Sequence, residues 1–410
     1  MKFNKPAKNK LCILAQLCKF IPEHAVPKLA KELKVDSRGF TPWSHVVSLL
    51  YCQLVCSISL NDLCDSMRLN IGKLSLIRAA RPPAKNTLSN ANKQRDPELM
   101  KRLFWQTFDH LMQMNKCFGF QGRYKGLPRR FKKVIHAVDS STISLVANCM
   151  DWAKHRRRKA AAKMHLRLNL NSFLPSFVLI EEASHNDAYR ARELCSGLCD
   201  GEIVLFDKAY VDYQHLHDLD SRGVSWVTRA KSNMSVIVRK RLLKKPSGNI
   251  LRDDLILIKD KKKRLNYPIL MRRVVAMVEV NGELKEMTFI TNNLDWSART
   301  VCDLYKARWA IEVFFKQIKQ TLKLGSFIGH SKKAIQWQIW AALLLYILVR
   351  FHSMQSNWPH SFTRILMLLR FSCWKRIEVF DMLRIYGTAG GVWRTQAKPE
   401  QSYLPGLKLI

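Results

Sequence analysis

The order of hydrophobic patterns between residues 133 and 230 places the tightest constraint on what this chain can fold into. Three β-branched or alternating runs come first, at 133–145, 164–171 and 176–184. Short runs of this kind at close intervals are typical of a meander of strands. A helical stretch follows at 187–198, so the pattern up to this point is β-β-β-α.

The next apolar run, 201–207, is continuous rather than alternating, which indicates a buried parallel strand after the helix. A second helix at roughly 211–221 and a strand at 224–230 complete a β-β-β-α-β-α-β order. This order predicts an α/β fold with a ribonuclease H-like core.

The residues before this core have a helical pattern. Thr41 is followed by Pro42 and an apolar run, and Ser59 or Asn61 precedes the next run. A capping residue followed by proline at the first helical position is a signal for the start of a helix. We therefore expect residues 1–115 to form a compact module of short helices.

The residues after the core return to strands and then to helices. Turn signals alternate with short strands at 231–287, which indicates a β-rich insertion, and a strand at 286–294 leads into a helical segment. The expected division of the chain is a helical N-terminal domain (1–115), a basic linker (116–133), the first part of the core (134–230), the β-rich insertion (231–287), the second part of the core (288–350) and a helical C-terminal region (351–410).

The charge of the chain indicates a polyanionic partner. Lys and Arg number 69 against 32 Asp and Glu, which gives a net charge of +37, and such self-repulsion is expected in a protein that binds nucleic acid. Three basic runs, at 122–133, 153–167 and 229–245, contain no acidic residue, a pattern that favours phosphate contacts. We expect the helical N-terminal domain to contact DNA too, although ordinary helical bundles have the same pattern.

Neither a membrane span nor a disulfide framework is predicted. The longest apolar run, 339–349, has eleven residues, whereas a transmembrane helix needs about twenty, so this run is expected to be a buried helix. No signal-peptide pattern is present at the N-terminus. The eleven cysteines lie mostly in apolar segments without the histidine spacing of zinc sites, which favours reduced core thiols. The expected location is therefore the cytoplasm.

The segment Leu304–Leu324 is predicted to form one helix with two different stripes. At roughly 100° per residue, its apolar residues gather on one side, as in a helix that faces a core. Tyr305, Arg308, Glu312 and Lys319 share a second stripe within about 60° of each other. One anion beside two cations and a phenol fits a solvated ion pair, and it also fits metal-assisted phosphate chemistry.

Two aspartates of the core are candidates to meet this glutamate. Asp139 interrupts an otherwise uncharged strand, and Asp207 ends the buried strand, where side chains enter the crevice of an open α/β sheet. Three nearby carboxylates repel one another unless hard cations neutralise them. We therefore predict Asp139, Asp207 and Glu312 as catalytic residues and metal ligands. The expected cofactor is Mg²⁺, with Mn²⁺ as a substitute. Two ions about 3.5–4 Å apart can activate the nucleophile and stabilise the leaving oxygen of a phosphodiester.

The residues around these acids resemble a known family. Tyr305, Arg308, Glu312 and Lys319 fit the pattern YxxRxxxExxxxxxK, the signature of bacterial insertion-sequence DDE transposases of the family numbered four. The stretches AVDSSTI and FDKAYVD are similar to the two aspartate motifs of that family, and FTPWSHVVSLLYCQL and NTLSNAN to its helical leading domain. Many relatives have Arg-Gly after the second aspartate, where this chain has Lys208-Ala209, which puts the role of that loop in doubt.

The resemblance implies a DNA transposase that acts by cut-and-paste. Water activated by metal nicks the element's end, and the freed 3′-hydroxyl attacks the opposite strand or target DNA. Its partners would be the inverted-repeat ends and target DNA, with a homodimer in the synaptic complex. Tyr305, Arg308 and Lys319 are then expected to grip phosphates near the cut. Trp309 and, with less support, Trp226 are candidates to stack on an unpaired base, and core packing is the alternative for both.

The basic runs supply further candidates for DNA contacts. These are Arg156, Arg157, Arg158 and Lys163 of the second run and Arg229 and Lys231 of the third.

Other assignments of the acids and of the function stay open at this stage. Asp187, with His185 close by, competes with Asp207 as the second ligand, although its place before a helix favours a cap. Asp212 is expected to start the next helix. A ribonuclease H-fold nuclease that cuts without joining, and a catalytically inactive DNA-binding protein, are the alternatives to a transposase.

Overall fold

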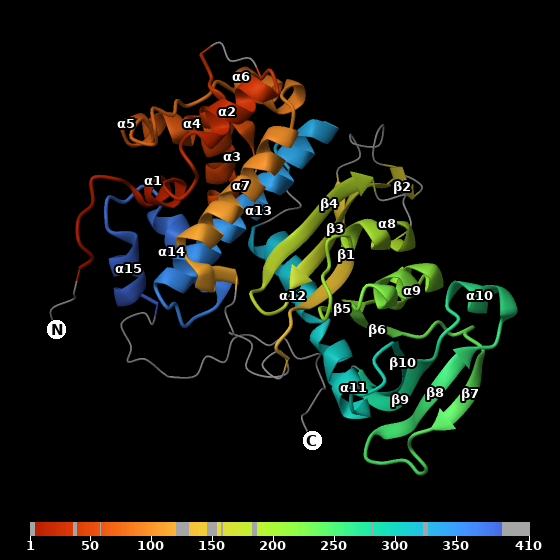
Figure 1. Ribbon diagram of the computed structural model, residues 1–410. Helices are drawn as coiled ribbons and strands as arrows, with labels where there is room; N and C mark the ends of the chain where they lie inside the picture. The colour runs from red at the N-terminus through yellow and green to blue at the C-terminus, as the bar shows by residue number, and fades with distance from the viewer. Residues whose placement is uncertain are drawn as a thin grey trace. The chain divides into compact units, whose positions relative to one another are not determined.

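The computed structural model describes most of the chain in two compact units. The described residues are 5–35, 39–57, 59–119, 131–145, 154–156, 159–182, 187–280, 282–322 and 327–387. The first unit, here called the helical unit, falls within Met1–Phe118, Ile143–Ala161 and Lys316–Glu400, and the second, the sheet unit, within Gly119–Thr142, Ala162–Phe315 and Gln401–Ile410. Figure 1 shows the elements of both units.

The helical unit is built from helices at both ends of the chain. Its N-terminal helices are α1 (Ile13–Cys18), α2 (Ala25–Glu32), α3 (Pro42–Val55), α4 (Leu60–Leu69), α5 (Ile71–Leu74), α6 (Lys85–Gln94) and α7 (Glu98–Met114), and the 3-10 helix η1 (Lys116–Gly119) follows α7. Its later elements are the π-helical turn η5 (Gln317–Thr321), α13 (Lys332–Gln355), α14 (Phe362–Ser372) and α15 (Val379–Ile385). The starts of α3 and α4 were predicted correctly, since Thr41 and Ser59 cap them with their side chains.

Helix α13 forms the centre of the helical unit. It contacts α3, α6, α7 and α14, and in Figure 1 it runs alongside α7. The prediction that the run at 339–349 is a buried helix is confirmed, because every residue from Ile339 to Val349 is buried. Helix α13 is long and apolar enough to span a membrane, and so is the pair α3 and α4, which is bent by 105°. However, 89% of the most apolar stretch of α13 is buried inside the protein.

The sheet unit contains the predicted core. Its strands and helices are, in chain order, β1 (Ile135–Leu145), β3 (Lys159–Asn169), β4 (Leu174–Glu182), α8 (Asp187–Leu194), β5 (Ile203–Phe206), the 3-10 helix η4 (Lys208–Tyr210), α9 (Tyr213–Ser221), β6 (Ser225–Arg229), β7 (Val236–Arg241), β8 (Ile250–Ile258), α10 (Lys261–Asn266), β9 (Met271–Val280), β10 (Glu283–Thr291), α11 (Ala298–Ala307) and α12 (Ala310–Lys316). The short strand β2 (Lys154–Arg156) pairs with the start of β3. The β-β-β-α-β-α-β order from β1 to β6 confirms the ribonuclease H-like α/β prediction.

The strands form one mixed sheet. Among the described residues the order is β2-β3-β1-β5-β6-β10-β9-β8-β7, with β4 paired to β3. Strands β1, β5 and β6 are parallel to one another, whereas β10 is antiparallel to both β6 and β9. The predicted β-rich insertion is therefore a continuation of the core sheet.

Helices α8 and α9 pack on one face of this sheet. Their apolar residues share a buried cluster with alternate residues of the central strands, among them Val138, Phe206 and Trp226. Trp226 is fully buried, and its indole N–H donates to the Leu216 carbonyl oxygen at 3.1 Å. The core-packing alternative for Trp226 is thus correct, and its side chain is not available to stack on a base.

The segment predicted as one helix over Leu304–Leu324 is interrupted, which corrects that prediction. Helix α11 ends at Ala307, α12 begins at Ala310, and the chain widens into the π-helical turn at Gln317. The N–H groups of Arg308 and Trp309 bond three residues back, to Tyr305 and Lys306. A constant 100° periodicity does not detect such local tightening. The apolar stripe predicted for Leu304–Leu324 is nevertheless largely buried, as at Ile311.

A buried histidine of the helical unit makes stability depend on pH. His45 is fully buried, its Nε2 lies 2.8 Å from Asn92 Oδ1, and its ring lies 4.3 Å from that of Trp337. Burial lowers the pKa of His45 to about 3, although the bond to Asn92 opposes that shift. The histidine is therefore neutral in the folded chain and becomes protonated on unfolding at acidic pH.

We predict that His45→Gln weakens the acid sensitivity of folding. The contribution of His45 is fully present above pH 6.5 and is lost as the pH falls toward 3, by up to about 1.4 kcal/mol per pH unit. Urea unfolding at several pH values between 7.5 and 4 should show a shallower decline for the variant. An identical decline in both proteins would contradict the prediction.

Candidate active site

Asp139 and Asp207 lie on neighbouring parallel strands of the sheet unit. The last residue pair of the ladder between β1 and β5 is Val138 with Phe206. Asp139 is the next residue of β1, and Asp207 directly follows the end of β5. Neighbouring strands lie ~4.8 Å apart. The sheet therefore brings together two carboxylates that are distant in the sequence.

Both aspartates point to the face opposite α8 and α9. Val138 and Phe206 belong to the core beneath those helices, and successive side chains of a strand alternate between faces. Helix α11 covers the face with the aspartates. The ring of Tyr305 lies 4.9 Å from that of Phe289. Phe289 is next in the strand to a residue of the core beneath α8 and α9, so its side chain points to the opposite face of the sheet. The α11–α12 segment can therefore bring its own side chains to the two aspartates.

Asp207 is held by one residue from α11 and one from β6. The Tyr305 hydroxyl and Arg229 Nη2 both donate to Asp207 Oδ1 at 3.3 Å. Burial raises the pKa of Asp207, but the charges of Arg308 and Arg229 and the N–H groups of Lys208 and Ala209 outweigh it and hold the pKa below its ordinary value. Asp207 is therefore ionised at neutral pH.

Arg308 connects the other two acids. Its Nη1 donates to Asp139 Oδ2 at 2.9 Å and its Nη2 to Glu312 Oε1 at 2.7 Å. It lies in the break between α11 and α12, with only 12% of its side chain exposed. One guanidinium thus occupies the space between two of the three predicted catalytic carboxylates.

Burial disfavours the charged form of Asp139. It raises the pKa of Asp139 to about 6, and the nearby carboxylates of Glu312 and Asp207 add to the rise, whereas Arg308 and the Ser140 N–H, 2.8 Å from Oδ1, oppose it. Burial would lower the pKa of Arg308, but Tyr305, Asp139 and Glu312 outweigh it and raise the pKa. The three acids therefore share an electrostatic environment in which the positive charge of Arg308 is central.

The chemistry of these side chains suits a divalent metal ion, but their placement does not form a metal site. Carboxylate oxygens are the ligands that Mg²⁺ prefers, and a bound cation would oppose the rise in pKa that burial causes at Asp139. Within the described ranges, however, no three His, Cys, Asp or Glu side chains lie close enough together to hold an ion. Arg308 occupies the place of a cation between Asp139 and Glu312.

The remaining residues predicted to bind DNA lie in different settings. Lys319 belongs to η5 of the helical unit, and burial lowers its pKa. Trp309 is half-buried, and its indole N–H is buried without a hydrogen-bond partner among the described residues. Lys231 Nζ donates to the Val211 carbonyl oxygen at 2.9 Å, and Lys163 is half-buried opposite Glu181 in the β3–β4 ladder. Their contacts with DNA stay predictions.

Some of the candidates fall outside the described part of the chain. Arg157, Arg158 and His185 lie outside it, and Arg156 and Asp187 are placed by their backbone in β2 and α8, with side chains outside it. Asp212 caps α9 by accepting from the His215 N–H at 2.9 Å, as the sequence predicted.

Sequence reasoning missed the partners of the two aspartates. Arg229 donates to Asp207, and its place at the end of a strand parallel to β5 was the available signal. The predicted contact of Arg229 with DNA stays a prediction. The N–H groups of Ser140, Lys208 and Ala209 carry no signal, because almost every residue has one.

Comparisons with known proteins identify the family. Residues 130–348 match the family described as "Transposase DDE domain", and residues 9–77 match a family described as a domain of unknown function, DUF4372. The chain therefore belongs to the family of transposases with this DDE domain.

Individual relatives are named as transposases, and two of the three described here are named for insertion sequence elements. A protein of Sinorhizobium fredii named as a transposase, y4zB, is 32% identical over 65% of this chain and 71% of its own length. A Geobacillus stearothermophilus protein, named as a transposase for insertion sequence element IS5377, is 27% identical over 65% of this chain and 66% of its own. Transposase InsG for insertion sequence element IS4 of Escherichia coli is 23% identical over 59% and 58%.

A solved structure of the piggyBac transposase synaptic complex with hairpin DNA is 11% identical and covers 94% of this chain and 85% of its own, with a TM-score of 0.46.

We predict that neutralising the two aspartates changes stability in opposite directions. Asp139 has a raised pKa, so its stabilising contribution is present below pH 3.8 and is lost as the pH rises through 6. Asp207 has a lowered pKa, so its contribution is present above 3.8 and is lost only in stronger acid. At pH 7, without metal or DNA, Asp139→Asn should raise the thermal midpoint, and Asp207→Asn should lower it, by ~2–4 °C per kcal/mol.

The control for this prediction is the same measurement at pH 4. There the wild-type Asp139 is largely protonated, so the gain from Asp139→Asn should disappear. Shifts of the same sign for both variants at pH 7 would contradict the electrostatic description of the site.

Proposed function

We propose that this transposase nicks the ends of an insertion sequence and transfers the freed strand to target DNA, using Asp139, Asp207 and Glu312. Two observations support the proposal: the two aspartates lie at neighbouring parallel strands, and Arg308 bonds to both Asp139 and Glu312. All three lie within residues 130–348, the part that matches the transposase DDE domain.

The proposed chemistry needs divalent metal, which DDE transposases generally use. When bound, two such ions would activate the attacking oxygen and stabilise the leaving oxygen of a phosphodiester. Asp139, Asp207 and Glu312 would hold them, while Tyr305 and Arg229 orient Asp207. The hydrogen bonds from these two side chains and the N–H groups of η4 keep that carboxylate ionised and in one orientation.

Arg308 has two roles in this proposal. In the chain without DNA it compensates part of the negative charge of Asp139 and Glu312 and lowers the cost of burying them. With DNA bound, its guanidinium turns to a phosphate oxygen beside the cut, for which its bidentate fork is well suited. The two acids are then free to take metal. Arg308 therefore couples DNA binding to completion of the active site.

The other DNA contacts are proposed from charge and position. Tyr305, Lys319, Lys163, Lys231 and the arginines at 156–158 would bind the backbone, and Trp309 would contact a base near the cut. Inverted-repeat ends and target DNA are the proposed partners, and a homodimer would bring two ends together.

We predict that Asp139→Asn, Asp207→Asn and Glu312→Gln each abolish nicking but leave DNA binding in place. The assay uses Mg²⁺ and a duplex that carries the terminal sequence flanking the gene, with nicked strands resolved on a denaturing gel. Asp303→Asn, which neutralises an acid of α11 outside this network, is the matched control and should cut like the wild type.

A variant of the three that still cuts would remove its residue from the active site. Joining of the cut end to a plasmid distinguishes a transposase from a nuclease, and a wild-type chain that binds the duplex but never nicks it would favour an inactive DNA-binding protein.

We predict that Arg308→Gln strengthens metal binding in the absence of DNA. Removing a cation a few ångströms from the carboxylates removes a repulsion of roughly 1–4 kcal/mol, so Mn²⁺ should bind at least about fivefold more tightly. Electron paramagnetic resonance of free Mn²⁺ measures this directly, with Arg308→Lys as the control that keeps the charge. Equal or weaker Mn²⁺ binding by Arg308→Gln would show that Arg308 does not compete with the ion.

A further inference from the structure

We propose that a hollow in the helical unit binds a DNA strand, with a phosphate held by Lys73, Lys375 and Arg376 and a base or sugar against Phe371. This cationic hollow lies between α5 and the segment 371–377, which begins in the last turn of α14. The inference rests on the proposed function in one respect, which is that the chain acts on DNA, and it adds a binding site away from the three acids.

The hollow is large and continues into a second one. It measures about 450 Å³ and is lined by Lys73, Phe371, Cys373, Trp374, Lys375, Arg376 and Ile377. An adjoining hollow of about 360 Å³ shares Lys73 and Arg376 and adds residues of α4 and α5. Each volume is within the ~300–1,000 Å³ of ligand sites. The shared cations make a path that suits an extended chain of phosphates better than a single ion.

The charged side chains that line the two hollows are cationic. Among the residues that the structure describes, no acidic residue lines either hollow. Within the described part of the chain, no hydrogen bond or ion pair is made by the side chains of Lys73, Lys375 and Arg376. The neighbouring acid Glu378 is bonded to the Asn9 side chain. Three cations without a counter-ion in one concavity therefore favour an anionic ligand with several charges.

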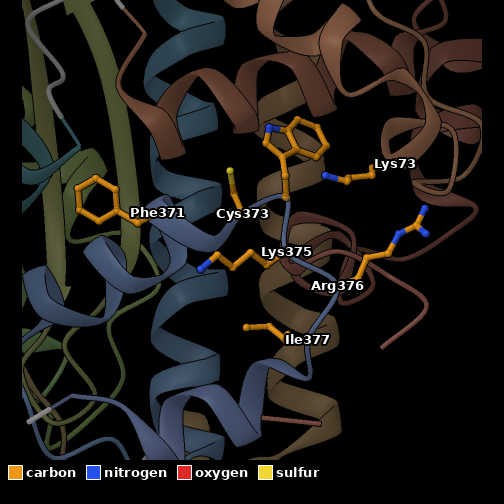
Figure 2. Close-up of a pocket in the computed structure, with 7 residues that line it drawn as sticks. Lys73, Phe371, Cys373, Lys375, Arg376 and Ile377 are labelled. Atoms are coloured by element: carbon orange, nitrogen blue, oxygen red, sulfur yellow. The ribbon is translucent and has the colours of Figure 1, made fainter. Parts of the chain in front are cut away.

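An exposed aromatic ring lies beside these cations. Phe371 belongs to the last turn of α14 and is 80% exposed. In the view of Figure 2, Phe371 lies on one side of Cys373, and Lys73 and Arg376 lie on the other. A cationic groove combined with an exposed aromatic ring is the usual arrangement for binding single-stranded nucleic acid, because every base has a face that can stack.

The backbone that presents these side chains is held in place. The N–H groups of Leu14, Ile13 and Asn9 donate to the carbonyl oxygens of Cys373, Lys375 and Arg376 at 2.9, 3.1 and 3.1 Å.

The indole next to the cations is fixed as well. Trp374 Nε1 donates to the Tyr51 hydroxyl at 3.0 Å. Side chains on a pre-ordered backbone lose less entropy on binding than those on a mobile loop. This order lowers the entropic cost of binding a DNA strand to the cations and to the Phe371 ring.

The first test measures the salt dependence of DNA binding by the full chain. Fluorescence anisotropy with a fluorescein-labelled oligonucleotide, single-stranded or paired to its complement, gives the affinity at several salt concentrations. The variant Lys73→Ala/Lys375→Ala/Arg376→Ala should lower the slope of log K against log salt by about 2 for the single strand and by up to about 3 for the duplex. The control Lys259→Ala/Lys261→Ala/Lys262→Ala removes the same charge from an exposed part of the insertion and should change the slope less.

The second test removes the ring. Phe371→Ala should weaken binding of the single strand about tenfold, with an unchanged salt slope, because stacking carries no net charge. The control is Leu265→Ala, which shortens an apolar side chain of α10 that is 81% exposed and should leave affinity unchanged.

These measurements can overturn the inference without affecting the proposed function. Wild-type slope and affinity in the triple variant, or equal effects of the two triple variants, would show that the hollow is not a DNA site. Loss with one probe only would assign the site to single-stranded or to duplex DNA. The charge reversal Lys375→Glu/Arg376→Glu, at two exposed positions, repeats the test if the triple variant does not fold. If the wild-type chain binds neither probe, both proposals fail.

Discussion

The contact of Arg308 with Asp139 and Glu312 is the interaction on which the rest of the site depends. Burying a carboxylate without a counter-charge is costly, and Asp139 shows that cost in its raised pKa. A guanidinium in the break between α11 and α12 bonds to both acids at once, which compensates part of it. The same contact places Glu312 near β1. Arg308 therefore brings together two of the acids that are proposed to bind metal ions.

The β-rich insertion contributes to this geometry through the sheet it extends. Arg272 of β9 makes a buried two-bond contact with Asp253 of β8, at 2.7 and 2.6 Å. It also donates to the carbonyl oxygens of Leu294 and Trp296, in the loop that leads from β10 into α11. The insertion thus holds the start of the helical segment that brings Tyr305, Arg308 and Glu312 to the aspartates.

Much of this arrangement could be predicted from local patterns. The alternation in β3 and the continuous apolar run of β5 identified those strands, because burial on one or both faces requires those patterns. Asp139 and Asp207 were recognisable as acids where apolar residues are expected. The break at Arg308 was not predictable, since it changes the helix by less than one turn, and neither was the pairing of Arg229 with Asp207, which depends on strand register.

The sequence by itself determined the order of strands and helices, the candidate acids and the strongly basic character of the chain, because these follow from the period and chemistry of neighbouring residues. Only the tertiary structure decided that Asp139 and Asp207 share one face of adjacent strands, that Arg308 lies between Asp139 and Glu312, and that Trp226 is in the core. These outcomes depend on the pairing of distant segments and on the dielectric environment that their packing creates.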